Sequence, residues 1–235
     1  MKTWNNNVSF SYKSILYGLK QRVHKDVRPS LNGIDKKLAL YLNYRSGFFI
    51  EAGANDGYSQ SNTYYLEKKM GWRGILIEAI PELYQKCLRE RKRSVVYNFA
   101  LVGNEYHKST LNMHYANLMS AAQDALKTEE ALRLHIRKGL EIQGIKESYT
   151  IDVPARTLGS ILDEKLNLPT IDLFSLDVEG FELEVLKGLN IEKYRPRYIL
   201  VEARFFKEVD DCLNVLYEMV DRFSEHDYLY KLKAF

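Results

Sequence analysis

The stretch Gly47–Gly57, G-F-F-I-E-A-G-A-N-D-G, decides the fold that we expect for this chain. Its apolar run Phe48–Ile50 leads directly into a turn of small residues, which is typical of a strand buried on both faces of a sheet. Gly53, Ala54 and Gly57 remove side-chain bulk where the chain turns, so that a ligand can approach main-chain N–H groups closely. We therefore expect a central strand that ends in a ligand-binding turn.

The charge of this turn indicates the kind of ligand. A dinucleotide phosphate site has the pattern G-x-G-x-x-G without a crowding acid, whereas Glu51 precedes this turn and Asp56 lies within it. Carboxylates instead stabilise a cation, and S-adenosylmethionine (SAM) carries an ammonium and a sulfonium group. The alternative that the residues leave open is a structural turn without any ligand.

A helix and a second strand follow the turn. Ser59–Met70 has apolar residues at helical spacing and begins with residues that commonly cap helices. The strand Gly74–Ile77 then ends in Glu78, which lies 21 residues after Gly57. Nucleotide-binding βαβ units place their ribose-binding acid about 20 residues after the glycines. We predict that Glu78 binds ribose hydroxyls, and the alternative is a surface acid beside the helix that Pro81 begins.

The third predicted strand is Val95–Leu101, V-V-Y-N-F-A-L. Its distal end would lie near an adenine ring if the first two strands hold the rest of a nucleoside. Asn98 and Ala100 are candidates for cofactor binding on position alone.

A second pair of acids follows another buried strand within Thr170–Gly180, T-I-D-L-F-S-L-D-V-E-G. Asp177 and Glu179 stand at its tip, and parallel strands bring their carboxyl ends to the same edge of a sheet. We expect both acids to face the crevice beside the first turn. Alternatively, Glu179 caps the helix predicted over Phe181–Leu189 and Asp177 holds a loop.

The length of 235 residues predicts a single α/β domain with additions. We divide the chain into a helical segment 1–46, with helices over Tyr12–Val23 and Ile34–Tyr44, and a domain 47–235. An irregular stretch at about 102–150 reads as a lid-like insertion with a helix over Ala121–Leu140. Three histidines in it are reserve candidates for catalysis, namely His107, His114 and His135.

The end of the chain predicts a shortened sheet. Arg197–Glu202 reads as a fifth strand and Val209–Phe223 as a helix. Asp227–Phe235 then has room for one further strand only.

Composition narrows the function classes. The chain has 34 Lys+Arg against 31 Asp+Glu, so its charge does not favour nucleic acid or a membrane surface. The basic run Lys86–Arg93 is interpreted as a solvated helix end. Cys87 and Cys212 fall in predicted helices of a chain without a signal peptide, which predicts reduced thiols and a cytoplasmic protein. No apolar run reaches the ~20 residues of a membrane span, and the residues do not predict an oligomeric state.

With both acidic centres located, the sequence resembles the FkbM family of SAM-dependent methyltransferases. The match extends from Gly47 to about Arg204, while the first 46 residues, most of Val102–Thr150 and the C-terminus lie outside it. The matching residues are Gly47–Gly57, Ser61–Thr63, Leu66–Glu67, Gly71–Trp72, Gly74–Glu78 and Ile171–Leu189.

The resemblance implies a class I methyltransferase fold, a Rossmann-like and mostly parallel sheet flanked by helices. It implies SAM as methyl donor and a hydroxyl of a sugar, glycan precursor or natural product as acceptor. The implied cofactor residues are Glu51, Gly53, Ala54, Asn55, Asp56, Gly57, Ser61, Asn62, Thr63, Glu78 and Ala79, with Asp177 and Glu179 beside the transfer site. Many members have lysine where this chain has Ser175, and class I folds usually end in an antiparallel strand pair.

Methyl transfer to a hydroxyl needs a base or a metal ion, because an alcohol is a weak nucleophile at neutral pH. We predict that Asp177 is the base and that no metal is required. If Mg²⁺ or Mn²⁺ does bind, its oxygen ligands would be Asp177, Glu179 and Glu202.

Two other functions remain open. A nicotinamide-dependent oxidoreductase would share the fold, although the G-x-G-x-x-G pattern is missing. A non-catalytic binding module would have kept the fold but lost the chemistry, and the acids present in this chain argue against it. Methylation of nucleic acid or protein is disfavoured, because an N-P-P-Y-type motif and a basic surface are absent from the sequence.

Overall fold

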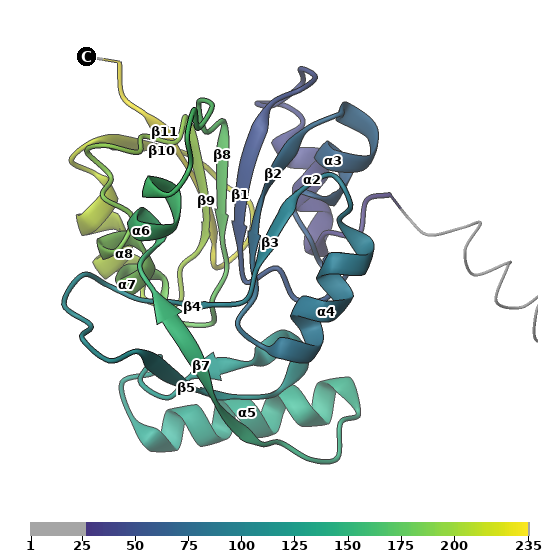
Figure 1. Ribbon diagram of the computed structural model, residues 1–235, viewed down its shortest axis with the longest axis vertical. Coiled ribbons are helices and arrows are strands. Elements are labelled where there is room, and N and C mark those ends of the chain that lie inside the picture. The colour runs from purple at the N-terminus through teal and green to yellow at the C-terminus, as the bar shows by residue number, and fades with distance from the viewer. Residues whose placement is uncertain (1–26, 235) are drawn as a thin grey trace, which may run out of the picture.

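The computed structural model describes residues 27–234, which form two sheets with helices packed around them (Figure 1). The larger sheet has the strand order β10-β11-β9-β8-β1-β2-β3 and the smaller one β4-β7-β5-β6. The larger sheet consists of β1 (Phe48–Ala52), β2 (Arg73–Ile77), β3 (Val95–Tyr97), β8 (Leu173–Leu176), β9 (Tyr198–Glu202), β10 (Tyr217–Arg222) and β11 (Asp227–Leu232). The smaller sheet consists of β4 (Ala100–Leu101), β5 (Thr110–His114), β6 (Ala121–Ala122) and β7 (Thr150–Arg156).

Helices lie between most of these strands. They are α2 (Ile34–Leu38), α3 (Tyr64–Met70), α4 (Pro81–Glu90), α5 (Glu129–Gln143), α6 (Leu158–Asp163), α7 (Glu182–Lys187) and α8 (Phe206–Leu213), with short 3₁₀ turns η1 (Leu31–Gly33) and η2 (Asn117–Met119). The predicted helix Tyr12–Val23 lies outside the described residues. None of the helices in residues 27–234 has the length and apolar character that crossing a bilayer requires.

The centre of the larger sheet is parallel, as the sequence predicts. β1 pairs in parallel with β2 on one side and β8 on the other, so that Ala52 lies beside both Ile77 and Leu176. β9 continues the parallel order next to β8. The chain segments that follow these strands therefore all start at one edge of the sheet, which is where the acidic residues are.

Alternate residues of each central strand enter different cores. Phe49 packs with Leu38 of α2 and Leu66 of α3 on one face. Ile50 packs with Ile161 of α6 and Val185 of α7 on the other face. Both faces of β1 are thus covered by helices, which explains its unbroken apolar run.

The C-terminal part differs from the sequence prediction. The predicted helix Val209–Phe223 is wrong, because α8 ends at Leu213 and the chain returns as β10. β10 and β11 form an antiparallel pair, and β11 also pairs with β9. The register of β10 shifts between Met219 and Asp221, and such an irregularity interrupts the alternation by which a strand is recognised. The sheet therefore has the antiparallel pair that the sequence appeared to lack.

The smaller sheet comes from the middle of the chain. The predicted strand Val95–Leu101 divides at Asn98 and Phe99, so that β3 belongs to the larger sheet and β4 to the smaller. The predicted helix over Ala121–Leu140 is instead the short strand β6 followed by α5. Figure 1 shows α5, β5 and β7 as a separate layer below the larger sheet.

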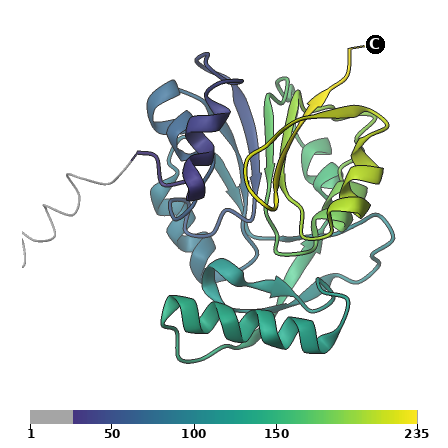
Figure 2. The same ribbon diagram turned by 180° about the vertical axis from the view of Figure 1, so that it is seen from behind.

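Two helices are shorter than predicted. The helix expected over Ser59–Met70 begins at Tyr64, because the residues before it bond to Glu51. The helix expected over Ile34–Tyr44 is α2, which lies against the sheet next to the C-terminal strands (Figure 2). The Tyr41 hydroxyl just after α2 donates to Asp221 of β10 at 2.9 Å, so this segment is part of the folded domain.

Candidate active site

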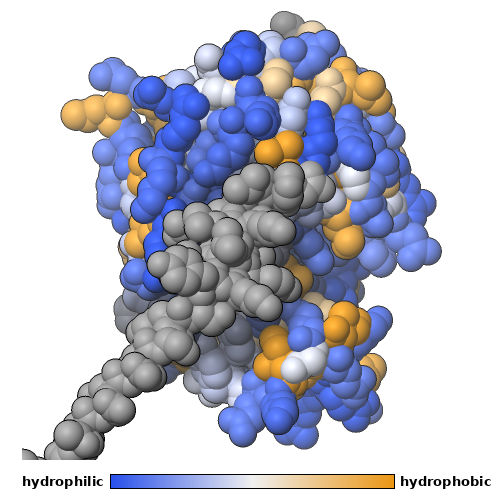
Figure 3. Space-filling model, turned by 90° about the vertical axis from the view of Figure 1, so that its right-hand side faces the viewer, coloured by the Kyte–Doolittle hydropathy of each residue, from blue (hydrophilic) through white to orange (hydrophobic). Residues whose placement is uncertain are grey.

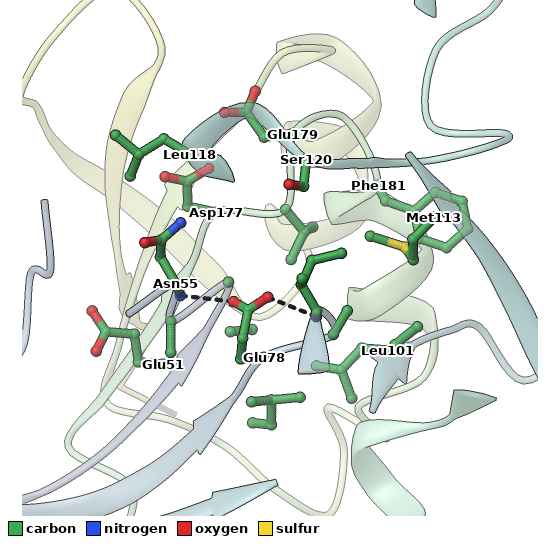
Figure 4. A pocket seen from close by; sticks show the side chains of 18 of the residues that line it. Glu51, Asn55, Glu78, Leu101, Met113, Leu118, Ser120, Asp177, Glu179 and Phe181 are labelled. Carbon is green, nitrogen blue, oxygen red and sulfur yellow. Dashed lines mark hydrogen bonds between the residues drawn. The ribbon is translucent and has the colours of Figure 1, made fainter. Parts of the chain in front are cut away.

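A cleft of about 940 Å³ lies at the carboxyl edge of the larger sheet and is open to solvent. The ends of β1, β2 and β8 form one wall, and residues of the smaller sheet and η2 form the other (Figure 4). Glu78 lies near the middle of the view, with Met113 and Phe181 to one side, Asp177 and Glu179 above, and Glu51 at the opposite side. This volume includes space open to solvent, and the cleft lies where open α/β sheets bind ligands, at the carboxyl ends of the strands.

The turn after β1 does not offer free main-chain donors, contrary to the expectation from its glycines. The N–H groups of Gly53 and Ala54 both donate to the Ile77 carbonyl at 3.1 Å. The N–H of Asn55 donates to the Glu78 carboxylate at 2.7 Å, and that of Gly57 to the Ala54 carbonyl at 2.9 Å. The turn is therefore held by its own backbone bonds, and a ligand meets its side chains and carbonyl groups.

The two glycines of this turn are required by packing. Gly53 has φ +79°, and a Cβ there would lie 1.7 Å from the Asp177 carbonyl oxygen. Gly57 also has φ +79°, and a Cβ would lie 2.8 Å from Arg91 and 3.0 Å from Cys87. Glycine lets the turn after β1 pass directly against the residue that follows β8, which fixes these two segments relative to each other.

Glu51 is buried and holds the loop before α3. Its carboxylate accepts hydrogen bonds from the Ser61 hydroxyl at 2.9 Å, the Asn62 N–H at 3.1 Å and the Thr63 hydroxyl at 2.6 Å. Asn62 in turn donates from its side chain to Ser175 of β8 at 3.3 Å. Glu51 and the loop thus form one hydrogen-bonded unit along the cleft.

Arg91 neutralises this unit, and the sequence analysis missed it. Its guanidinium is fully buried, 3.1 Å from Glu51 and 3.0 Å from Glu67, and it also donates to Thr63 at 2.8 Å. The interpretation of Lys86–Arg93 as a solvated helix end is therefore wrong for Arg91. The residues around Arg91 in the sequence do not indicate that it is buried, because the acids that pair with it are far from it in the chain.

Glu78 joins the ends of β1 and β2. One of its carboxylate oxygens accepts the Asn55 N–H at 2.7 Å, and the other accepts the Ile80 N–H at 2.8 Å (Figure 4). Burial raises the pKa of Glu78 to about 7, against the lowering effect of these N–H groups. Each carboxylate oxygen retains a lone pair that can accept a hydroxyl hydrogen.

Asp177 carries one of the unsatisfied buried oxygen atoms of the cleft, as does Asn62. The Oδ1 atom of Asp177 is buried and has no hydrogen-bond partner among the described residues. Burial raises the pKa of Asp177 well above its usual range, and the neighbouring carboxylate of Glu202 raises it further. In its ionised form, a carboxylate with a raised pKa is a stronger base than an ordinary aspartate.

Glu179 lies two residues after Asp177, in the segment that follows β8. Its φ of +57° is in the left-handed region, and its carboxylate accepts a hydrogen bond from Arg204 at 2.6 Å. The His135 ring lies 3.5 Å from the same carboxylate. Burial lowers the pKa of His135 to about 4, with help from Arg204, so this histidine is neutral near pH 7.

The structure brings most of the predicted site residues to one cleft. Those that line it are Glu51, Gly53, Ala54, Asn55, Ser61, Asn62, Glu78, Ala79, Ala100, Asp177 and Glu179. Those that do not are Asp56, Gly57, Thr63 and Asn98, while Glu202 lines an adjoining pocket. The side chain of Asp56 instead binds the N–H groups of Tyr58 and Ser59, and that of Asn98 binds the carbonyls of Glu78 and Ala79.

Several lining residues were not predicted. They are apolar side chains from the smaller sheet, its connections and the start of α7, namely Phe99, Leu101, Leu111, Met113, Leu118 and Phe181. Apolar residues in an irregular stretch give no local signal of ligand contact. Of the reserve histidines, none lines the cleft, and only His135 reaches its acidic residues.

The acids also meet the geometric requirement for a divalent cation. One carboxylate oxygen each from Asp177, Glu179 and Glu202 lies within 4.8 Å of the others, and Mg²⁺ and Mn²⁺ prefer such oxygen ligands. However, Glu179 already forms an ion pair with Arg204 at 2.6 Å. The donor set fits a metal ion only if Glu179 releases this arginine.

Strand order and site together define the class of protein. A parallel sheet that ends in an antiparallel pair, with acids after β2 and β8 on the two sides of β1, is a class I methyltransferase fold. A family model described as the methyltransferase FkbM domain matches residues 51–230. The chain therefore belongs to the FkbM family of SAM-dependent methyltransferases. The match includes the insertion and the C-terminal strands, which the sequence resemblance had left outside.

Solved structures give more distant likenesses. The chain is similar to a TehB-like SAM-dependent methyltransferase from Corynebacterium glutamicum at 10% identity, over 94% of this chain and 98% of that one, with TM-score 0.44. It is similar to a methyltransferase from Geobacter sulfurreducens at 10% identity, over 94% and 89%, with TM-score 0.46. A putative SAM-dependent methyltransferase from Methanococcus maripaludis has 8% identity over 98% and 96%, with TM-score 0.45. Among curated proteins, no significant match was found.

Proposed function

We propose that the protein transfers a methyl group from SAM to a hydroxyl oxygen of a sugar, glycan precursor or natural product. The observation that carries this proposal is the placement of two buried carboxyl groups, Glu78 and Asp177, in a single cleft. One is suited to hold a nucleoside and the other to accept a proton. The two stand on opposite sides of the turn after β1, which fixes their separation.

The cleft can accommodate the parts of SAM in order. The Glu78 carboxylate would accept the ribose hydroxyls, because its fixed oxygens retain free lone pairs. The apolar side chains of Leu101, Met113 and Phe181 would enclose the adenine ring beside it. The amino acid part would lie against the Gly53–Asn55 turn and the loop that Glu51 holds.

Asp177 would act as the base in the transfer step. SAM supplies an activated methyl group, and the acceptor hydroxyl has to approach it in line, at about 3 Å. Asp177 Oδ1 is available to accept the hydroxyl proton, since no described residue hydrogen-bonds to it. Glu179 and Arg204 would border the acceptor and keep the charge of this region fixed.

We propose that no metal ion is needed. Arg204 stabilises Glu179 in the position that a cation would occupy. The alternative is a Mg²⁺ or Mn²⁺ ion bound by Asp177, Glu179 and Glu202 that lowers the pKa of the acceptor hydroxyl.

The acceptor would be a small molecule or saccharide, without nucleic acid as a partner. We place the reaction in the cytoplasm because both cysteines are free thiols, with Cys87 buried against Arg91. A cytoplasmic location would also expose the enzyme directly to the cellular pool of SAM.

Binding measurements test this proposal against its rivals. Calorimetry with SAM, S-adenosylhomocysteine (SAH) and NADH should show binding of the first two only. Glu78→Ala should weaken SAH binding by about tenfold or more, because a charge-assisted hydrogen bond contributes roughly 1.5–3 kcal/mol. Binding of NADH in place of SAH would favour the oxidoreductase, and binding of neither would favour a non-catalytic module. Unchanged affinity in Glu78→Ala would reject the ribose assignment.

A further inference from the structure

A second hollow of about 820 Å³ opens from the cleft beside Asp177 and Glu179. We call it the acceptor pocket, because it adjoins the proposed base on the side away from Glu78. It shares Gln60, Asn62, Leu118, Asp177 and Glu179 with the cleft. Its other lining residues are Leu31, Ile34, Met119, Ile142, Gln143, Glu202, Arg204 and Asp227.

A row of carboxylates on three neighbouring strands forms the floor of the acceptor pocket. Asp177 follows β8, Glu202 ends β9 and Asp227 begins β11. Glu202 and Asp227 are direct cross-strand partners in the antiparallel pair. Like charges placed opposite each other destabilise a sheet. A positive group bound in the acceptor pocket would relieve the repulsion between Glu202 and Asp227.

The described lining residues provide a single positive side chain against these acids. It is Arg204, whose guanidinium already lies 2.6 Å from Glu179. Glu202 and Asp227 have no such cation among the lining residues. Burial raises the pKa of Asp227 and the charge of Glu202 raises it further, whereas the hydrogen bond from the Ser224 hydroxyl and the charges of His226 and Lys37 lower it. An anionic acceptor would be repelled here, and a cationic one attracted.

The rim of the acceptor pocket is apolar and comes from outside the larger sheet. Leu31 belongs to η1, Met119 to η2 and Ile142 to α5. Leu31 is 53% exposed and Ile142 67% exposed. Figure 3 shows hydrophobic side chains at the surface of the lower layer, which contains α5. Such exposed apolar groups beside a polar floor favour a ligand with a hydrophobic flank.

We propose that the acceptor carries an ammonium group near the methylated hydroxyl and an apolar substituent on its other side, as in a hydrophobic amino-sugar derivative. This inference rests on the proposed function and specifies its acceptor. Glu202 and Asp227 bind the ammonium group, Leu31 and Ile142 contact the substituent, and Asp177 receives the hydroxyl proton. Acceptors with phosphate or carboxylate groups, including nucleotide sugars, are excluded by the same field.

Bisubstrate probes test this proposal without knowledge of the acceptor. In them, nitrogen replaces the sulfur of SAM and carries a short alkyl arm that reaches into the acceptor pocket. The arm ends in an ammonium, a hydroxyl or a carboxylate group. Calorimetry should give an affinity about tenfold higher for the ammonium probe than for the hydroxyl probe, and about tenfold lower for the carboxylate probe. The preference should shrink in 0.5 M salt, which screens exposed charges.

Matched variants separate this proposal from the proposed function. In the double variant Glu202→Gln, Asp227→Asn, the three probes should bind within about threefold of one another while SAH binds as before. Glu218→Gln, an exposed acid on β10, should keep the wild-type preference. Equal affinities of the three probes for the wild type would overturn the acceptor proposal alone. If SAH itself does not bind, the proposed function fails and this inference fails with it.

Discussion

The guanidinium of Arg91 and the carboxylate of Glu51 lie 3.1 Å apart in the interior, although they are separated by 40 residues in the chain. This pair joins the end of α4 to β1, the strand that leads into the Gly53–Asn55 turn. Glu67 of α3 completes it at 3.0 Å from Arg91. This ion cluster therefore links α4, β1 and α3 behind the cleft. We expect that removing Arg91 mainly lowers the stability of the protein.

Replacing Arg91 with methionine should destabilise the protein. The variant leaves the buried Glu51 carboxylate without its counter-charge and Glu67 with only Lys68, 3.9 Å away, and breaking a buried pair typically costs about 3–5 kcal/mol. Urea unfolding should therefore give a free energy of unfolding lower by about that amount. Arg89→Met, at an exposed position of the same helix, serves as the control and should stay within about 0.5 kcal/mol. Similar stabilities for the two variants would contradict a structural role of Arg91.

Asp177→Asn and Asp177→Ala should abolish methyl transfer while SAM binding survives. Loss of a general base typically lowers kcat by about 10²–10⁴-fold, and Asp177 lies beside the transfer site in the proposed arrangement. SAH release in a screen of glycans and amino-sugar derivatives identifies the acceptor, and calorimetry gives the affinity for SAH. Asp211→Asn, an exposed acid on α8, is the control. Equal turnover in the Asp177 variants and the wild type would remove Asp177 from the mechanism.

The free protein should lose stability as the pH rises from 5.5 to 8. Burial raises the pKa values of Glu78 and Glu182 to about 7 from 4.5, so the folded state binds these protons more tightly than the unfolded chain. Their contribution is greatest below pH 4.5 and is lost as the pH passes about 7. At about 1.4 kcal/mol per pKa unit, the combined decrease should be on the order of a few kcal/mol.

Denaturant unfolding at both pH values measures this change. Glu182→Gln should reduce the decrease because glutamine does not titrate. Its amide oxygen can still accept the Gly180 N–H, which Glu182 accepts at 2.8 Å. Glu218→Gln should leave the decrease as in the wild type. A free energy of unfolding that is constant or increases between pH 5.5 and 8 would show that these carboxyl groups do not retain their protons in the folded state.

Methyl transfer should continue after metal ions are removed. Arg204 already binds Glu179 at 2.6 Å, so the proposed mechanism needs no divalent cation. Rates of SAH formation should agree within about twofold with EDTA and with added Mg²⁺ or Mn²⁺. Loss of activity in EDTA, with recovery on adding Mg²⁺, would instead assign the three carboxylates to a metal ion.

The central strands and their acidic ends could be predicted from the sequence because their signals are local. An apolar run followed by small residues identifies β1, and the spacing of Glu78 from the glycines follows from one βαβ unit. The parallel order then places Asp177 at the same edge. These inferences depend on neighbours in the chain and on strand direction, both of which a sequence contains.

The remaining features depend on contacts between distant segments. Nothing near Arg91 in the sequence shows that Glu51 and Glu67 surround it in the interior. The strands β4 and β6 have two residues each, which is too short for any alternating pattern. The sequence predicts a helix where β10 lies, because the irregular pairing of this strand interrupts the period of two.

The contact between Gly53 and the Asp177 carbonyl has a consequence for the diversification of this enzyme. Any side chain at position 53 would push the end of β8 away, so the proposed methyl-donor site and the proposed base are held together as one rigid unit. The rim of the acceptor pocket is supplied by η1, η2 and α5, which do not belong to that unit. Substitutions at Leu31, Met119 or Ile142 can therefore redirect the enzyme to new acceptors while its donor chemistry stays intact.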